Sequence, residues 1–192
     1  AAEPAAAIDP ARFDVRGEPG GTFTVERTVA ATPAECFRLW STEAGVRAFL
    51  GIESRIELAV GGRYEWILAP DAPAGSRGSE GCQVLGWVPD SMLAFTWAAP
   101  PTLGEVRERR SWVVVRFEPL EPAADGTPRT RVRLDHCGLG EGEGWERTEA
   151  YFRRAWPSVL GAMRTHLEAA ADDAPADGAI DAAADAPADA AD

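Results

Sequence analysis

A helical stripe of apolar side chains between Gly144 and Glu168 is the clearest pattern in the chain. Its members recur at the spacing of an α-helix and share one face: Trp145, Phe152, Trp156, Val159, Leu160, Met163 and Leu167. Three aromatic rings on one face form a larger apolar patch than a monomer usually leaves in water. The pattern therefore predicts one long C-terminal helix packed against an apolar surface.

Alternation of apolar and polar residues predicts strands in the sequence before that helix. The expected strands span residues 21–30, 54–58, 63–68, 82–88, 92–97, 110–118 and 130–136. Turn residues separate neighbouring strands, as at Gly61–Gly62 and Pro89–Asp90. Short strands at such close spacing are typical of an antiparallel, strongly bent sheet.

Two short helices are expected directly after the first strand. Thr32 suits the N-cap of the first, with Pro33 at the first helical position and Glu35 at the third, which completes a capping box. A second helix is expected over residues 42–49, and Gly51 ends this pair of helices. The predicted order is one strand, two helices, six strands and a long helix. Such segregation of helices from strands is typical of an α+β fold.

Composition divides the chain into a single domain at residues 21–169 and two flanking segments. Residues 1–20 are rich in Ala, Pro and Gly and predict a poorly ordered lead-in. Residues 170–192 are an Ala/Asp/Pro sequence without a basic residue, which predicts a disordered acidic tail.

The distribution of charge bears on possible partners. The formal charge is −12, and seven of the acidic residues are the aspartates of residues 172–192. The rest of the chain is only mildly acidic, which argues against nucleic acid or an anionic membrane surface as a partner. No apolar run reaches the about 18 residues that a membrane-spanning helix needs.

The basic residues and the cysteines indicate the kind of genome that encodes the chain and its cellular location. All nineteen basic residues are arginine, and the chain has neither lysine nor asparagine. This bias, with abundant Ala, Gly, Pro and Asp, is typical of a GC-rich bacterial genome, and the lack of lysine excludes Schiff-base chemistry. Cys36, Cys82 and Cys137 form no C-x-x-C pair, and no secretory signal is evident. Both features predict a reducing, cytoplasmic location.

His136 is the candidate for acid–base chemistry. It shares the parity of Val132 and Leu134, so we expect it to point toward the helix. There a histidine could titrate near neutral pH or hold a polar ligand group. The alternative is a core histidine that is hydrogen-bonded to the backbone. His166 is the only other histidine and lies near the end of the long helix, so no metal site built on histidine is expected.

Two sets of charged residues can be interpreted either as functional groups or as solvent-exposed ones. Glu149 falls on the apolar stripe of the long helix, from which it would meet Arg27 or Arg116 at a cavity mouth. The alternative is exposure on the first turns of the helix. Residues 105–110 (EVRERR) are expected to form a solvated approach to a strand rather than an arginine binding cluster.

Seven tryptophans supply large, rigid surfaces, which suit a pocket for an apolar or aromatic ligand. Ordinary core packing would also explain most of them. The residues expected to line a cavity between sheet and helix are Tyr64, Trp66, Phe95, Trp97, Val113, Val115, His136, Glu149, Phe152, Trp156 and Met163. No residue is assigned as catalytic, and neither a cofactor nor a metal is expected.

Several stretches, taken in order, carry a resemblance to a known family. They are VAATPAECFRLWSTEAGVRAF after the first strand, GGRYEW, the VLGWVP and FTW parts of the next hairpin, TRVRLDHCGLGEG, and the aromatic C-terminal helix. Over about residues 22–168 the chain resembles the SRPBCC superfamily (START-like, helix-grip fold). More narrowly, it is similar to homologues of the C-terminal domain of the activator of heat shock protein 90 ATPase.

The resemblance implies a curved, seven-stranded antiparallel sheet wrapped around the last helix, with an apolar cavity between them. It also implies that reaction chemistry is often absent. The aromatic stripe and the shortage of convergent titratable groups favour a first hypothesis, a monomeric or homodimeric protein that binds a small hydrophobic or aromatic ligand. The family name suggests an alternative, stimulation of the heat shock protein 90 ATPase as a protein partner. A third is a cyclase or hydrolase of the same superfamily, in which His136, Glu149, Tyr64 or an arginine would converge.

Overall fold

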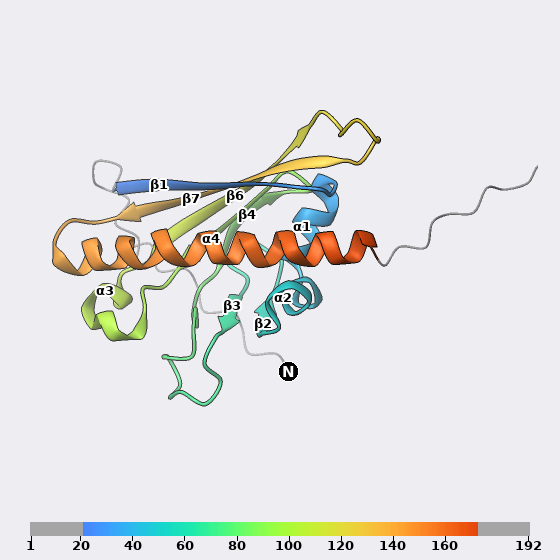
Figure 1. The fold of residues 1–192 in the computed structure, drawn as a ribbon. Helices are drawn as coiled ribbons and strands as arrows, with labels where there is room; N and C mark the ends of the chain where they lie inside the picture. Colours follow the sequence, from blue (N-terminus) through green and yellow to red (C-terminus); the bar gives the residue numbers. More distant parts are fainter. Residues whose placement is uncertain (1–20, 173–192) are drawn as a thin grey trace, which may run out of the picture.

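The computed structural model describes residues 21–172, which fold around one long helix, α4 (Glu143–Asp172). Figure 1 shows α4 between a five-stranded sheet on one side and a layer of short elements on the other. This is the helix-grip α+β arrangement that the sequence predicts. The predicted lead-in and nearly all of the predicted acidic tail lie outside the described residues.

The larger sheet is antiparallel throughout and has the strand order β1-β7-β6-β5-β4. Its strands are β1 (Gly21–Val29), β4 (Val84–Val88), β5 (Met92–Trp97), β6 (Ser111–Leu120) and β7 (Arg129–Leu139). Because side chains alternate between the two faces of a strand, cross-strand neighbours share a face. The row formed by Leu93, Val115 and Leu134 is fully buried and belongs to the apolar face of the sheet.

The two remaining strands form a separate antiparallel pair: β2 (Glu53–Ile56) and β3 (Tyr64–Ile67). The seven expected strands are all present within residues 21–172, but the sheet is interrupted between β3 and β4. A bridge between Arg63 and Gln83 connects the two sheets. Beyond it, Ser79 from the following loop pairs with β3, because its Oγ accepts from Trp66 N–H and its own N–H donates to Trp66 O. The loop thus occupies the edge where β4 would have paired.

The two short helices follow β1 as predicted: α1 (Pro33–Ser41) and α2 (Glu43–Leu50). The capping box at α1 is confirmed, since Thr32 Oγ1 accepts from Glu35 N–H at 3.2 Å and the Glu35 carboxylate accepts from Thr32 N–H at 2.7 Å. Helix α2 ends at Gly51, whose φ of 68° is the left-handed conformation that glycine adopts most readily.

The apolar stripe of α4 is buried against the sheet and α1, and the helix continues through Pro157 as one element. Met163, for example, is fully buried and its sulfur accepts from the indole N–H of Trp40 in α1 at 3.2 Å. No helix among residues 21–172 combines the length and the apolarity that crossing a bilayer requires.

Candidate functional site

An apolar hollow lies beside α4, where the helix passes the ends of α2, β3 and β5. It has a volume of about 280 Å³. Its lining residues are all apolar or aromatic: Leu50, Ile52, Trp66, Leu68, Trp97, Tyr151, Phe152, Ala155, Trp156 and Val159. We call this space the apolar hollow.

The apolar hollow has an aromatic floor and a more exposed rim. The floor consists of Trp66, Trp97, Phe152 and Trp156, each at most 5% exposed. Its rings contact one another, with centroids 5.2 Å apart between Trp66 and Trp97 and 5.3 Å apart between Trp97 and Trp156. Tyr151, at 42% exposed, belongs to the rim. The floor is therefore held by packing, whereas rim side chains have room to move.

Four of the residues that the sequence singles out form this floor. Six others are fully buried in the core and do not line the hollow: Tyr64, Phe95, Val113, Val115, His136 and Met163. Tyr64 stacks on Phe95 at 4.0 Å, and its hydroxyl donates to Trp40 O at 2.9 Å. These side chains fill the space between sheet and helix, which leaves the hollow at the side of α4. A ligand-binding role for any of these residues stays a prediction.

Glu149 lies at the surface of α4 rather than in the hollow. Its carboxylate pairs with Arg153 one turn later, at 2.6 Å between Oε1 and Nη2. It does not pair with Arg27 or Arg116, and Arg116 binds Asp135 instead. The solvent-facing alternative describes this residue, because the guanidinium at position i+4 satisfies its charge locally.

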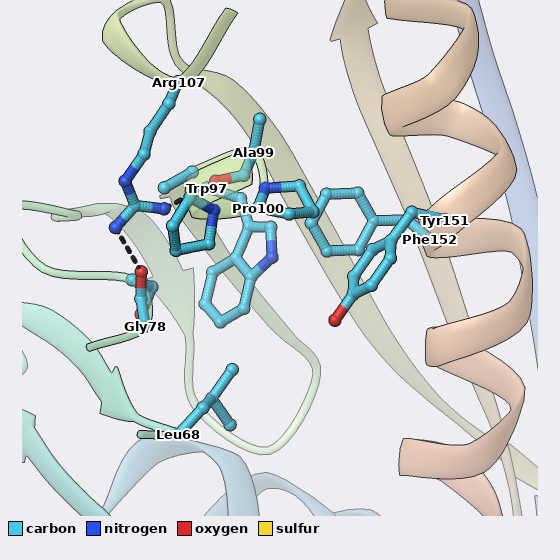
Figure 2. A pocket seen from close by; sticks show the side chains of 11 residues that line it. Leu68, Gly78, Trp97, Ala99, Pro100, Arg107, Tyr151 and Phe152 are labelled. Carbon is cyan, nitrogen blue, oxygen red and sulfur yellow. Dashed lines mark hydrogen bonds between the residues drawn. The ribbon is translucent and has the colours of Figure 1, made fainter. Parts of the chain in front are cut away.

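A smaller hollow of about 60 Å³ adjoins the apolar hollow and shares Leu68, Trp97, Tyr151 and Phe152 with it. Figure 2 shows Arg107 at one end of this smaller hollow and the α4 side chains Tyr151 and Phe152 at the other. Trp97 and Pro100 lie between them. The polar groups that line the smaller hollow include this buried arginine, two of the carbonyls that it binds, and Ser79.

Arg107 corrects the expectation that residues 105–110 are a solvated approach to a strand. This segment instead contains the short helix α3 (Gly104–Glu108), which follows the single turn η2 (Pro101–Leu103). Arg107 is only 8% exposed, because its guanidinium donates to the carbonyls of Gly75, Gly78 and Ala99 at 2.5–3.0 Å. Burial, followed by the charge of a neighbouring arginine, lowers its pKa.

His136 points toward α4, as its parity predicts, and takes part in a chain of buried hydrogen bonds. Trp156 Nε1–H donates to His136 Nδ1 at 3.0 Å, and His136 Nε2 lies 2.8 Å from Ser111 Oγ. The Ser111 hydroxyl in turn donates to Trp97 O at 3.3 Å. The chain connects β5, β6, β7 and α4, and its two ends, Trp97 and Trp156, belong to the floor of the apolar hollow.

The directions of these bonds fix what His136 can do. Because Nδ1 accepts from Trp156, the neutral imidazole carries its proton on Nε2 and donates it to Ser111. The Ser111 hydroxyl donates its own proton to Trp97 O. His136 therefore does not act as a base on Ser111. Both ring nitrogens are occupied by side chains rather than by the backbone. This arrangement positions the Trp156 indole and the backbone of Trp97, and it leaves neither ring nitrogen of His136 free for a substrate.

No cluster of three His, Cys, Asp or Glu side chains within residues 21–172 is arranged to hold a metal ion. The Ser111–His136 pair is likewise buried away from the hollow's opening, at 1% and 0% exposure. The chemistry that the site does offer is apolar contact on aromatic rings.

Comparisons with known proteins bear on the fold. No protein-family model and no curated protein sequence matches the chain. Among solved structures, a protein from Mesorhizobium loti aligns with a TM-score of 0.58 at 21% identity, covering 78% of this chain and 98% of that one. A protein from Nitrosomonas europaea aligns with a TM-score of 0.54 at 14% identity, covering 86% and 99%.

The Aha1 dimer from Colwellia psychrerythraea aligns with a TM-score of 0.50 at 15% identity, covering 77% of this chain and 96% of that one. This chain has the Aha1-like fold. The match extends over nearly the whole of each neighbour and confirms the predicted helix-grip architecture. The Colwellia protein forms a dimer, while the oligomeric state of this chain stays a prediction.

One pH dependence follows from the position of His136 inside this Aha1-like fold. Burial lowers the pKa of His136 from 6.5 to about 3. The unfolded chain therefore binds a proton that the folded chain does not, and stability falls as the pH drops below about 6.5 toward 3. We expect the free energy of unfolding to decrease by about 2 kcal/mol between pH 7.5 and pH 5. Urea unfolding at a series of pH values measures this.

Two variants isolate the histidine contribution. In His136→Gln the decrease over this pH range should disappear, and a slope equal to that of the parent would contradict the assignment. His166→Gln leaves His136 as the single histidine. Its imidazole nitrogen resonances should then show the neutral tautomer protonated on Nε2 throughout the range.

Proposed function

We propose that the protein binds a small hydrophobic ligand in the apolar hollow and does not transform it. The observation that carries this proposal is the composition of the hollow, whose ten lining side chains include no charged group. Its volume of about 280 Å³ is close to the lower end of ligand pockets, which suits a small molecule. The aromatic floor supplies broad, rigid surfaces, and aromatic side chains contribute strongly to ligand contact.

The rim supports the same proposal. Leu68 is 55% exposed and Tyr151 is 42% exposed, although both side chains are large and apolar or aromatic. Exposed apolar groups that surround a concave surface are characteristic of interaction sites. A ligand in the hollow would remove these side chains from water and so gain the hydrophobic free energy that the free protein leaves unused.

Filling the hollow should abolish binding without unfolding the protein. Ala155 lies on α4 at the rim, so Ala155→Trp places an indole in the space that a ligand would occupy. With the uncharged fluorescent probe N-phenyl-1-naphthylamine, we expect affinity to fall about tenfold or more. Ala169→Trp, at an exposed position further along α4, is the matched control and should retain the parent's affinity.

Equal affinity in the two tryptophan variants would contradict binding in the hollow, provided that their melting temperatures match the parent's. Native mass spectrometry of the purified protein supplies a second readout, a bound mass that Ala155→Trp loses. Stimulation of the heat shock protein 90 ATPase and cyclase or hydrolase chemistry stay predictions of the resemblance, and a cytoplasmic location stays a prediction from the cysteines and the N-terminal sequence. An ATPase assay with the chaperone tests the first of them directly.

A further inference from the structure

A third hollow, of about 250 Å³, continues along α4 from the other two and carries positive charge. Its lining residues are Pro100, Thr102, Leu103, Arg147, Ala150, Tyr151 and Arg154. We call it the arginine hollow. Tyr151 lines all three spaces, and Pro100 lines both this hollow and the smaller one. The apolar hollow and the arginine hollow therefore meet at Tyr151.

The two arginines flank that meeting point. Arg147 precedes Tyr151 by four residues and Arg154 follows it by three, so all three side chains share one face of the helix. Both arginines are exposed, and within residues 21–172 neither guanidinium has an ion pair or a hydrogen bond to another protein group. No acidic residue lines the arginine hollow.

Two other arginines near the hollows already bind protein groups. Arg107 donates to three backbone carbonyls, and Arg153 pairs with Glu149. The free positive charge beside the apolar hollow thus belongs to Arg147 and Arg154. An anionic group next to both would gain charge-assisted hydrogen bonds that this part of the chain does not itself supply.

We infer that the ligand is an amphipathic carboxylate, with its apolar body on the aromatic floor and its carboxylate between Arg147 and Arg154. This inference rests on the proposed function and adds the class of ligand. The orientation follows from solvation, because a carboxylate buried on the aromatic floor would lose its hydration without a partner. At the exposed end it keeps water and gains two guanidinium groups.

The test compares decanoate with decan-1-ol, which differ in the head group, as competitors of N-phenyl-1-naphthylamine. In the double variant Arg147→Gln/Arg154→Gln we expect decanoate to bind about fivefold or more weakly, with decan-1-ol and the probe within about twofold of the parent. Decanoate binding to the parent should also weaken with added salt. The control Arg129→Gln/Arg164→Gln removes the same net charge from exposed positions outside the arginine hollow.

The outcomes separate the two claims. The carboxylate site is overturned if decanoate affinity is unchanged in Arg147→Gln/Arg154→Gln, or if the control variant lowers it equally. In either case, continued binding of the probe still supports the apolar hollow. If the parent binds neither the probe nor either competitor, the proposed function itself is overturned. Circular dichroism of each variant checks the fold, which these substitutions at exposed positions should preserve.

Discussion

Replacing His136 with leucine is expected to lower the free energy of unfolding by about 3 kcal/mol. Leucine fills a similar volume but offers no acceptor to Trp156 and no donor to Ser111. The indole N–H of Trp156 would then be buried without a partner, and such a group costs about 1–3 kcal/mol. Ser111 Oγ would lose the donor that now lies 2.8 Å away. Urea unfolding followed by tryptophan fluorescence measures the loss.

The variant His136→Gln distinguishes lost hydrogen bonds from lost ring packing. Glutamine can accept from Trp156 through its carbonyl and donate to Ser111 through its amide, so it should retain more stability than leucine. A double-mutant cycle with Trp156→Phe adds a second check, since removing both partners should cost less than the sum of the single changes. Additive losses would contradict a direct bond between the two side chains.

Replacing Arg107 with methionine is expected to cost about 3 kcal/mol, because three carbonyl oxygens lose a charged donor in a nearly buried position. Methionine retains much of the apolar stem, so the loss reports on the guanidinium. We also expect faster hydrogen exchange in residues 75–81, since Arg107 holds the carbonyls of Gly75 and Gly78. Urea unfolding and hydrogen-exchange mass spectrometry measure the two effects.

Two comparisons make this result specific to the geometry of the guanidinium. Arg107→Lys keeps the charge but cannot donate to three separated carbonyls, so its stability should fall between the parent and Arg107→Met. Arg47→Met changes an exposed arginine of α2 and should alter stability by no more than about 0.5 kcal/mol. Equal losses in Arg107→Met and Arg47→Met, with none in Arg107→Lys, would show that net charge, and not the buried contacts, is responsible.

Local rules in the sequence account for most of the fold. The capping box of Thr32 and Glu35 sets the start of α1, and the strand expected at residues 92–97 coincides with β5. The interruption between β3 and β4 could not be read in the same way. It depends on the Ser79 hydroxyl accepting from Trp66 N–H, a contact across thirteen residues between a loop and a strand edge.

The candidate site was predictable only in part. Strand parity and the helical stripe indicate which side chains point inward, and Trp97 and Trp156 are both buried in the structure. Whether inward side chains fill a space or leave a hollow depends on how their volumes fit in three dimensions, so the rim residues were missed. Arg107 gave no signal, because two of its acceptors lie about thirty residues earlier in loops without a motif.

The hydrogen-bond chain through His136 can form only late in the synthesis of the protein. Its last donor is Trp156, which leaves the ribosome after every strand of the sheet. Until α4 docks, the apolar face of the sheet is uncovered and His136 Nδ1 has only water to bind. During synthesis the apolar face of the sheet therefore stays open to water until α4 docks, and such transiently exposed surface is prone to associate with other chains.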